Sequence, residues 1–102
     1  MVRIPTHRAP SHPGEILLHE FLEPLGISQS ELAGMIGVSF QRVNELVNGK
    51  RGMTPDTALR LEQVFGLDAS TWLNLQLALD LWQVMHSKAA AEIRKIPRLQ
   101  TA

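Results

Sequence analysis

The sequence predicts an all-α fold, which we expect to form a single domain. Apolar residues recur at helical spacing in several successive segments of the 102-residue chain. Serine, threonine or proline stands at the start of these segments and glycine near their ends, as is typical of capped helices. A chain of this length builds only a modest core, so it gains stability from association with a partner.

The first expected helix follows an irregular amino-terminal arm. Residues 1–12 are rich in proline, histidine and arginine and show no periodicity, which predicts an extended arm. Pro13 then suits the first turn of a helix, and Gly26 suits its exit. The apolar face of this helix is expected to comprise Ile16 or Leu17, Phe21, Leu22 and Leu25.

The segment 28–47 is the most informative part of the chain, because it matches a helix-turn-helix. Ser28 and Ser39 suit the N-caps of two short helices, and Glu31 completes a capping box with Ser28. Counted from Gln29 as the first position, the motif's small and apolar places hold Leu32, Ala33, Gly37, Val38, Val43 and Leu46. Such a unit presents its second helix to the major groove of DNA. An ordinary helical hairpin is the alternative, but these matches in register favour DNA binding.

Charge is distributed unevenly along the chain, although ten basic and ten acidic residues give a net charge of zero. Between residues 12 and 35 the charged residues are all glutamates, whereas 38–54 is net positive and the tail from 87 is basic. A neutral total with a basic recognition segment suits local DNA binding together with a second kind of partner.

Two further helices are expected after the loop 48–52. Residues 54–56 supply a threonine cap, a first-turn proline and a first-turn acid for a helix that ends at Gly66. The next helix is expected from near Ser70 to about His86.

The helix from 70 to 86 carries two apolar stripes on roughly opposite sides. The first stripe comprises Trp72, Leu75, Leu79 and Trp82. The second comprises Leu73, Leu77, Leu81 and Val84, and a narrow polar strip lies between the two. Because a helix of a monomer needs one apolar stripe, the second predicts a homodimer interface.

The chain therefore divides into an arm (1–12), a helix-turn-helix DNA-binding and dimerisation domain (13–86) and a tail (87–102) that fits a short sixth helix. The absence of cysteine excludes disulfides and thiolate metal sites, and the four histidines match no usual ligand spacing. No phosphate-binding loop or catalytic set is recognisable, so we expect neither an enzyme nor a cofactor. Without a signal peptide or an apolar membrane span in the sequence, we expect a cytoplasmic protein.

With these residues identified, the chain resembles the HigA family of antitoxins, also called plasmid-maintenance antidote proteins. The stretches 12–26, 28–50 and 54–76 carry the resemblance. It implies a five-helix, phage-repressor-like fold and a homodimer that binds operator DNA in its own promoter. It also implies a tight complex with a small toxin that cleaves messenger RNA on ribosomes. A free-standing helix-turn-helix regulator without a toxin is the alternative function.

The outer face of the second helix of the motif holds the expected DNA contacts. Gln41 suits a bidentate pair with adenine, Arg42 a contact with guanine or phosphate, and Phe40 a thymine methyl. The full set of candidates is Gln29, Ser39, Phe40, Gln41, Arg42, Asn44, Lys50 and Arg51. For Arg42, a surface ion pair with Glu45 or Glu15 is the alternative. Relatives often carry arginine in place of Phe40 or Glu45, so the operator sequence need not be shared.

Carboxylates of the first helix are the expected toxin-binding residues. They are Glu15, Glu20 and Glu23. A toxin that cleaves RNA is expected to carry a basic face, which an acidic surface would attract and orient. The basic tail is the weaker alternative for this role.

Overall fold

The computed structural model describes residues 8–100 and contains helices and loops but no strand within that part of the chain. The helical elements are α1 (Pro13–Ile16), η1 (Leu17–Leu22), α2 (Glu23–Leu25), α3 (Gln29–Ile36), α4 (Phe40–Val47), α5 (Pro55–Phe65), α6 (Ala69–Met85) and α7 (Ala89–Arg94). The all-α prediction is confirmed, and α7 is the short sixth helix expected in the tail. Most of the predicted arm, residues 1–7, lies outside the described residues, and residues 8–12 form no helix.

The first expected helix is a continuous helical path through α1, η1 and α2, but its middle turn is wider than an α-helix. Pro24 has no N–H group and its ring would collide with the carbonyl one turn earlier. The N–H of Glu23 instead donates to the carbonyl of Leu18, five residues back, which is the bonding pattern of a π-turn. Gly26 then ends the helix with a φ of 66°, a conformation that glycine adopts without strain.

The helix-turn-helix forms as its caps predict. Ser28 Oγ accepts from the N–H of Glu31 and Glu31 Oε1 accepts from the N–H of Ser28, both at 3.0 Å, which completes the capping box. Gly37 ends α3 with a φ of 72°, the left-handed conformation that the tight turn requires. Ser39 Oγ accepts from the N–H of Arg42 at 3.1 Å and so begins α4.

One hydrophobic core joins the helix-turn-helix to the first helical segment, α5 and α6. Trp72 of α6 is fully buried, with the ring of Phe21 5.3 Å from its own; Phe21 also lies 4.9 Å from Phe65 of α5. Leu17, Leu22, Leu32, Val43 and Leu61 complete the most deeply buried part. In the predicted first stripe of α6, Trp72 and Leu79 are buried and Leu75 packs partly against the core, whereas Trp82 is only half-buried.

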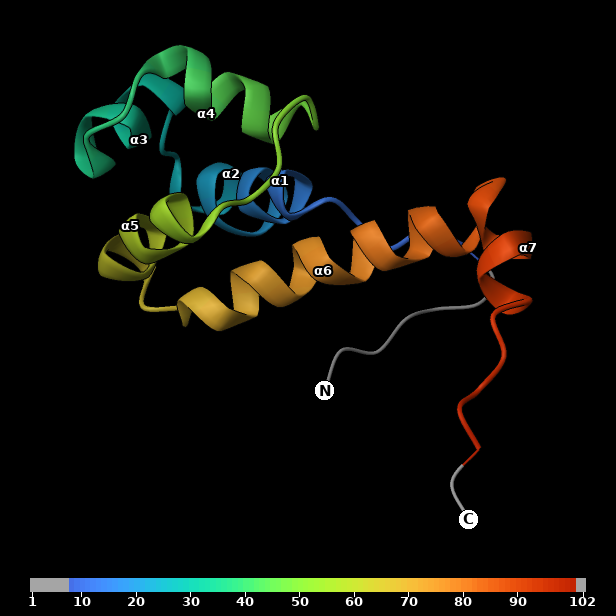
Figure 1. Cartoon of the computed structure of the whole chain (residues 1–102). Coiled ribbons are helices and arrows are strands. Elements are labelled where there is room, and N and C mark those ends of the chain that lie inside the picture. The colour runs from blue at the N-terminus through green and yellow to red at the C-terminus, as the bar shows by residue number, and fades with distance from the viewer. Residues whose placement is uncertain (1–7, 101–102) are drawn as a thin grey trace.

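The start of α6 is set by a residue that sequence inspection did not single out. Glu62 Oε1 accepts from the N–H of Ala69 at 2.7 Å, so the cap comes from α5 and the helix begins one residue before Ser70. The described tail leads away from α7 (Figure 1).

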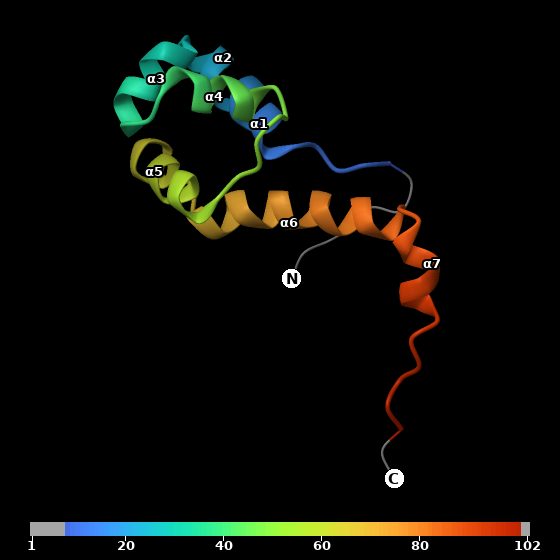
Figure 2. The ribbon, with the colours of Figure 1, turned by 45° about the horizontal axis from the view of Figure 1, so that its top comes forward.

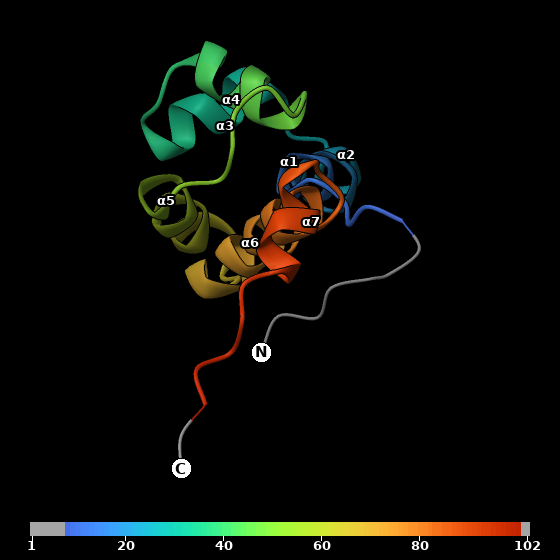
Figure 3. The same ribbon diagram turned by 45° about the vertical axis from the view of Figure 1, so that its right-hand side comes forward.

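The helices place α4 and α6 on opposite sides of the α1–α2 segment. In Figure 1, α4 lies above the α1–α2 segment and α6 beneath it, and the turned views in Figures 2 and 3 also place α6 below α4. The chain therefore has two well-separated faces: one over α3 and α4, and one along the far part of α6 and α7.

Candidate nucleic-acid interface

Helix α4 is fixed on its inner side and exposed on its outer side. Val43, Leu46 and Val47 are buried, whereas Phe40 is 51% exposed and Gln41 is exposed. A Cβ on Gly14 would lie 1.8 Å from the carbonyl oxygen of Leu46, so the first helix packs backbone to backbone against the end of α4. Only glycine permits that approach.

A side-chain hydrogen bond joins the two helices of the motif across the turn. Asn44 Nδ2 donates to Gln29 Oε1 at 3.0 Å. Both residues are predicted DNA contacts, and both are partly buried. The bond fixes Gln29 at the amino end of α3, where free backbone N–H groups suit a phosphate.

Arg42 makes a specific polar contact within the protein. Its Nη2 donates to Asp56 and to Thr57 Oγ1, each at 2.6 Å, and its side chain is 27% exposed. The hydrogen bonds from Arg42 and then from Arg60 lower the pKa of the Asp56 carboxyl. The partner of Arg42 is thus Asp56, rather than Glu45 or Glu15.

Arg51 is held by the recognition helix itself. Glu45 Oε1 accepts from Arg51 Nε at 3.2 Å and from its Nη2 at 2.8 Å. These bonds lower the pKa of the Glu45 carboxyl, and Gln41 Nε2 lies 3.5 Å from the other carboxylate oxygen. Lys50 is exposed and forms no ion pair within residues 8–100.

Two residues outside the motif make structural hydrogen bonds: Gln76 holds the backbone just after the loop that carries Lys50 and Arg51, and His12 caps the first helix. Gln76 of α6 accepts from the N–H of Met53 at 2.7 Å and donates to Asp80 at 2.9 Å. His12 Nδ1 accepts from the N–H of Gly14 at 2.9 Å and so caps the first helix; burial lowers the pKa of His12 and favours its neutral form.

The structural roles of four residues were missed from sequence. Glu45 and Asp56 pair with arginines on other elements, and helical periodicity carries no information about such pairs. In the sequence, Gln76 belongs to the narrow polar strip of its helix, and such a position indicates a surface residue. The position of His12 immediately before Pro13-Gly14 could have predicted its role as an N-cap, because an N-cap side chain needs only a hydrogen-bond acceptor.

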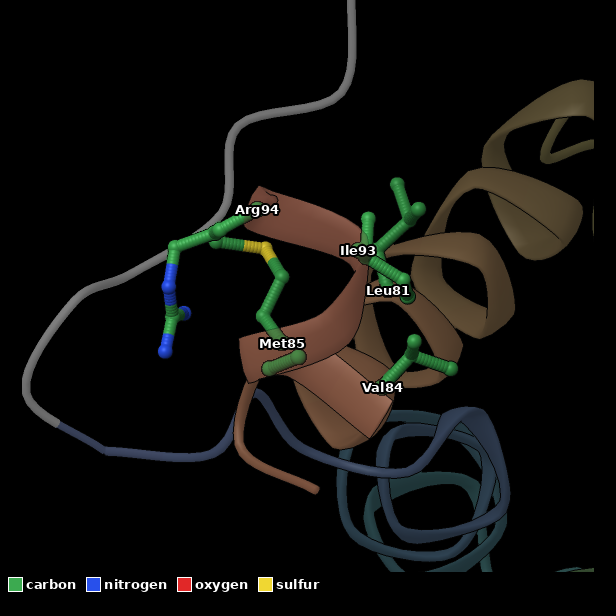
Figure 4. Close-up of a pocket in the computed structure, with 6 residues that line it drawn as sticks. Leu81, Val84, Met85, Ile93 and Arg94 are labelled. Atoms are coloured by element: carbon green, nitrogen blue, oxygen red, sulfur yellow. The ribbon is translucent and has the colours of Figure 1, made fainter. Parts of the chain in front are cut away.

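The predicted dimer stripe is exposed at its far end. Leu77 is 45%, Leu81 39% and Val84 47% exposed, whereas Leu73 packs partly against the core. An apolar pocket of about 370 Å³ lies at the α6–α7 junction. Its lining comprises Leu81, Val84, Met85, Ala90, Ile93 and Arg94 (Figure 4).

The predicted acidic surface lies on the first helical segment. Glu15, Glu20 and Glu23 are all exposed. Glu23 pairs with His19 at 2.7 Å, and that hydrogen bond raises the pKa of His19. Protonation of His19 therefore reduces the net negative charge of this surface.

Neither a metal site nor a membrane helix is found in the part of the chain that the structure describes. No three histidines, aspartates or glutamates converge there as metal ligands would. Across residues 8–100, the helices are too short or too polar to cross a bilayer.

Comparison with known proteins agrees with this geometry. Residues 18–72, more than half of the chain, match the helix-turn-helix family. Antitoxin HigA-1 of Vibrio cholerae is 43% identical over 76% of this chain and 72% of its own length. The uncharacterised helix-turn-helix regulator YbaQ of Escherichia coli K12 is 42% identical over 92% of this chain and 81% of its own. A solved structure of Pseudomonas aeruginosa antitoxin HigA with the higBA promoter aligns with a TM-score of 0.82 at 37% identity, covering 89% of this chain and 99% of that one. The chain belongs to the helix-turn-helix family and, within it, to the HigA family of antitoxins.

Proposed function

We propose that this antitoxin represses its own operon by binding operator DNA as a dimer, and that it neutralises a toxin that cleaves messenger RNA on ribosomes. The observation that carries the proposal is the outer face of α4, where Phe40 and Gln41 are exposed beside the half-buried polar residues of a helix that is fixed by its buried side. A related antitoxin solved with promoter DNA supports DNA binding by this fold. Operator binding would take place in the cytoplasm.

The DNA contacts divide into base readout and positioning on phosphates. Gln41 and Phe40 would meet base edges in the major groove, with Ser39 and Asn44 beside them. Lys50 would meet a phosphate.

Three more candidates would contact DNA while hydrogen-bonded to another side chain of the protein. Gln29 would meet a phosphate while bonded to Asn44, and Arg51 would do so while bonded to Glu45. Arg42 would contact DNA through N–H groups that Asp56 does not use.

The dimer would form through the exposed stripe of α6. The proposed interface residues are Leu73, Leu77, Leu81 and Val84, the last two of which also line the apolar α6–α7 pocket. A twofold arrangement would bury this face against the same face of a second copy. Two recognition helices would then meet half-sites about one helical turn, or roughly 34 Å, apart.

A pair of substitutions tests the DNA proposal. Gln41→Ala should weaken binding to a duplex selected by the wild type by about 1–3 kcal/mol and relax preference at one base position. Lys50→Ala should weaken binding to every sequence and reduce the salt dependence. Electrophoretic titration against selected and random duplexes measures both effects. If Gln41→Ala weakened binding to both duplexes equally, as Lys50→Ala should, the assigned roles would be wrong.

The acidic surface of the first helix is the proposed toxin-binding site. Glu15, Glu20 and Glu23 belong to the α1–α2 segment, which lies beneath α4 in Figure 1, so toxin and DNA would occupy different surfaces. Deleting residues 1–10 together with Glu20→Lys and Glu23→Lys should impair neutralisation in a growth-rescue assay and leave operator binding nearly intact. Full protection by that variant, with loss of protection on removing residues 88–102, would move the toxin site to the tail.

A free-standing regulator is the second candidate, since the relative YbaQ is described only as a transcriptional regulator. Co-purification with the product of a neighbouring gene separates the two. A stable complex with a small basic protein supports the antitoxin, and repeated isolation of the chain alone supports the regulator.

A further inference from the structure

We propose that Glu45 is a specificity-determining residue of the recognition helix: it positions Arg51 and Gln41 for DNA while its negative charge weakens binding to DNA in general. This inference rests on the proposed DNA-binding function. It concerns a carboxylate on the helix that is expected to enter a groove between two rows of phosphates, where a negative charge is unfavourable unless it has a role.

The first argument is the number of bonds that Glu45 makes to the loop after α4. Its backbone carbonyl accepts from the N–H groups of Lys50 at 2.8 Å and Arg51 at 3.2 Å. Its side-chain oxygen Oε1 accepts from Arg51 Nε and Nη2. One residue therefore fixes both the backbone and the side chain of the loop.

The second argument is the way in which the guanidinium is held. Both bonds from Arg51 end on a single oxygen, so the remaining N–H groups of its planar fork stay available for a phosphate. The side chain of Arg51 is 45% exposed, which leaves it accessible. A cation fixed in this way loses little side-chain entropy when it meets a phosphate in the correct place.

The third argument is the relation of Glu45 to Gln41. Gln41 stands one turn earlier on the same helix, and its Nε2 lies 3.5 Å from Oε2, the oxygen that Arg51 does not use. The same carboxylate thus orients a proposed base-reading residue and a proposed phosphate-binding residue.

The charge of Glu45 supplies discrimination against the wrong DNA. The bonds to Arg51 lower the pKa of its carboxyl, so it is ionised at neutral pH. The carboxylate offsets the positive charge of Arg51, which reduces the attraction to phosphates that every DNA sequence shares. Selective contacts to the correct bases are then needed for tight binding, and the ratio of specific to random affinity rises.

Three variants of the full-length chain test this inference, each titrated over a range of salt against a duplex selected by the wild type and against random DNA. Glu45→Gln keeps the shape of the side chain and removes its charge. Glu45→Asp keeps the charge but is one methylene too short to reach Arg51. Glu92→Gln makes the same charge change on an exposed residue of α7 and is the matched control.

For Glu45→Gln we expect random DNA to bind about fivefold more tightly, with a salt slope steeper by about 0.9 per chain, because one more cation is free for phosphates. The selected duplex should gain no affinity, so the specificity ratio falls. For Glu45→Asp we expect weak binding to random DNA, as in the wild type, and severalfold weaker binding to the selected duplex. Glu92→Gln should leave the ratio unchanged.

Two results would overturn this inference alone. If Glu45→Gln changes both affinities by the same factor, as a distant charge would, Glu45 does not set specificity. If Glu45→Asp retains full affinity for the selected duplex, Glu45 does not position Arg51. A wild-type chain that prefers no duplex over random DNA would overturn the proposed function itself and this inference with it. Equal thermal unfolding midpoints verify that the variants are folded.

Discussion

The surface over α3 and α4 differs sharply from the surface at the α6–α7 junction in how its side chains are bonded. Over α4, Arg42, Asn44 and Glu45 each bond to a side chain of another element. At the junction, Leu81 and Val84 are exposed and line a nearly apolar pocket. Hydrogen bonds orient the first surface already in the single chain, whereas the second exposes apolar area that water solvates poorly.

This difference separates recognition from assembly. A side chain that reads DNA needs a fixed direction, and bonds within the protein supply it before DNA arrives. A surface that joins two copies needs area and shape, which aliphatic side chains supply without direction. Gln76 connects the two, because it lies on α6 and holds the backbone of Met53 after α4.

The largest effect on stability is expected at Gly14, where the first helix packs against the recognition helix α4. Gly14→Ala would place a Cβ 1.8 Å from the Leu46 carbonyl oxygen, so the first helix must move away from α4. We expect a loss of about 3 kcal/mol or more in the free energy of unfolding, measured in urea. Gly34→Ala is the control, because its Cβ meets nothing within 4 Å, and it should stabilise α3 by about 0.5–1 kcal/mol. Wild-type stability for Gly14→Ala would contradict the packing of the first helix on α4.

The next largest effect should be on the stability of the dimer alone. Leu77→Asp would place a charge in the proposed dimer interface and weaken the dimer by about 3 kcal/mol, or roughly a hundredfold in dissociation constant. Leu59→Asp makes the same change at a similarly exposed leucine of α5 and should leave the dimer intact. Light scattering across a concentration series measures both, and a monomeric wild type at micromolar concentration would refute the interface.

A smaller effect tests the connection between the two surfaces. Gln76→Leu removes the acceptor for the N–H of Met53, a buried residue, and should cost about 1–3 kcal/mol in unfolding free energy. Gln83→Leu, on an exposed position of the same helix, is the comparison. If both variants unfold at the same urea concentration, Gln76 does not hold the loop.

The smallest effect is a dependence of stability on pH. Because its bonds to Arg42 and Arg60 lower the pKa of Asp56, its stabilising effect is present above the ordinary value of 3.8 and is lost as the pH falls below it. Asp56→Asn should therefore lower the melting temperature at neutral pH and bring it closer to that of the wild type in acid. Asp68→Asn, at a residue without an ion pair within residues 8–100, should show no such convergence.

Local signals predicted the fold well, because serine caps, glycine exits and helical periodicity act within one or two turns. They placed α3, α4 and α5 and anticipated α7. They did not predict the π-turn at Pro24 or the cap that Glu62 gives to α6. The π-turn depends on how a helix accommodates an internal proline, and the cap joins residues of different helices.

The candidate site was predicted only in part for the same reason. Outward positions on α4 follow from the inward places of Val43 and Leu46, so the candidate residues could be named. The partners of Arg42 and Arg51 depend on how α5 and the following loop return to α4. Such contacts are fixed by tertiary structure and leave no periodic trace in the sequence.

The central claim is that α4 reads DNA while the α6–α7 face holds two copies together. Hydroxyl-radical footprinting on a duplex selected by the wild type tests this most directly. We predict two protected patches related by an inverted repeat, about 10 base pairs apart, that Leu77→Asp loses at concentrations where the wild type binds fully. A single protected patch that is the same for the wild type and Leu77→Asp would contradict the account.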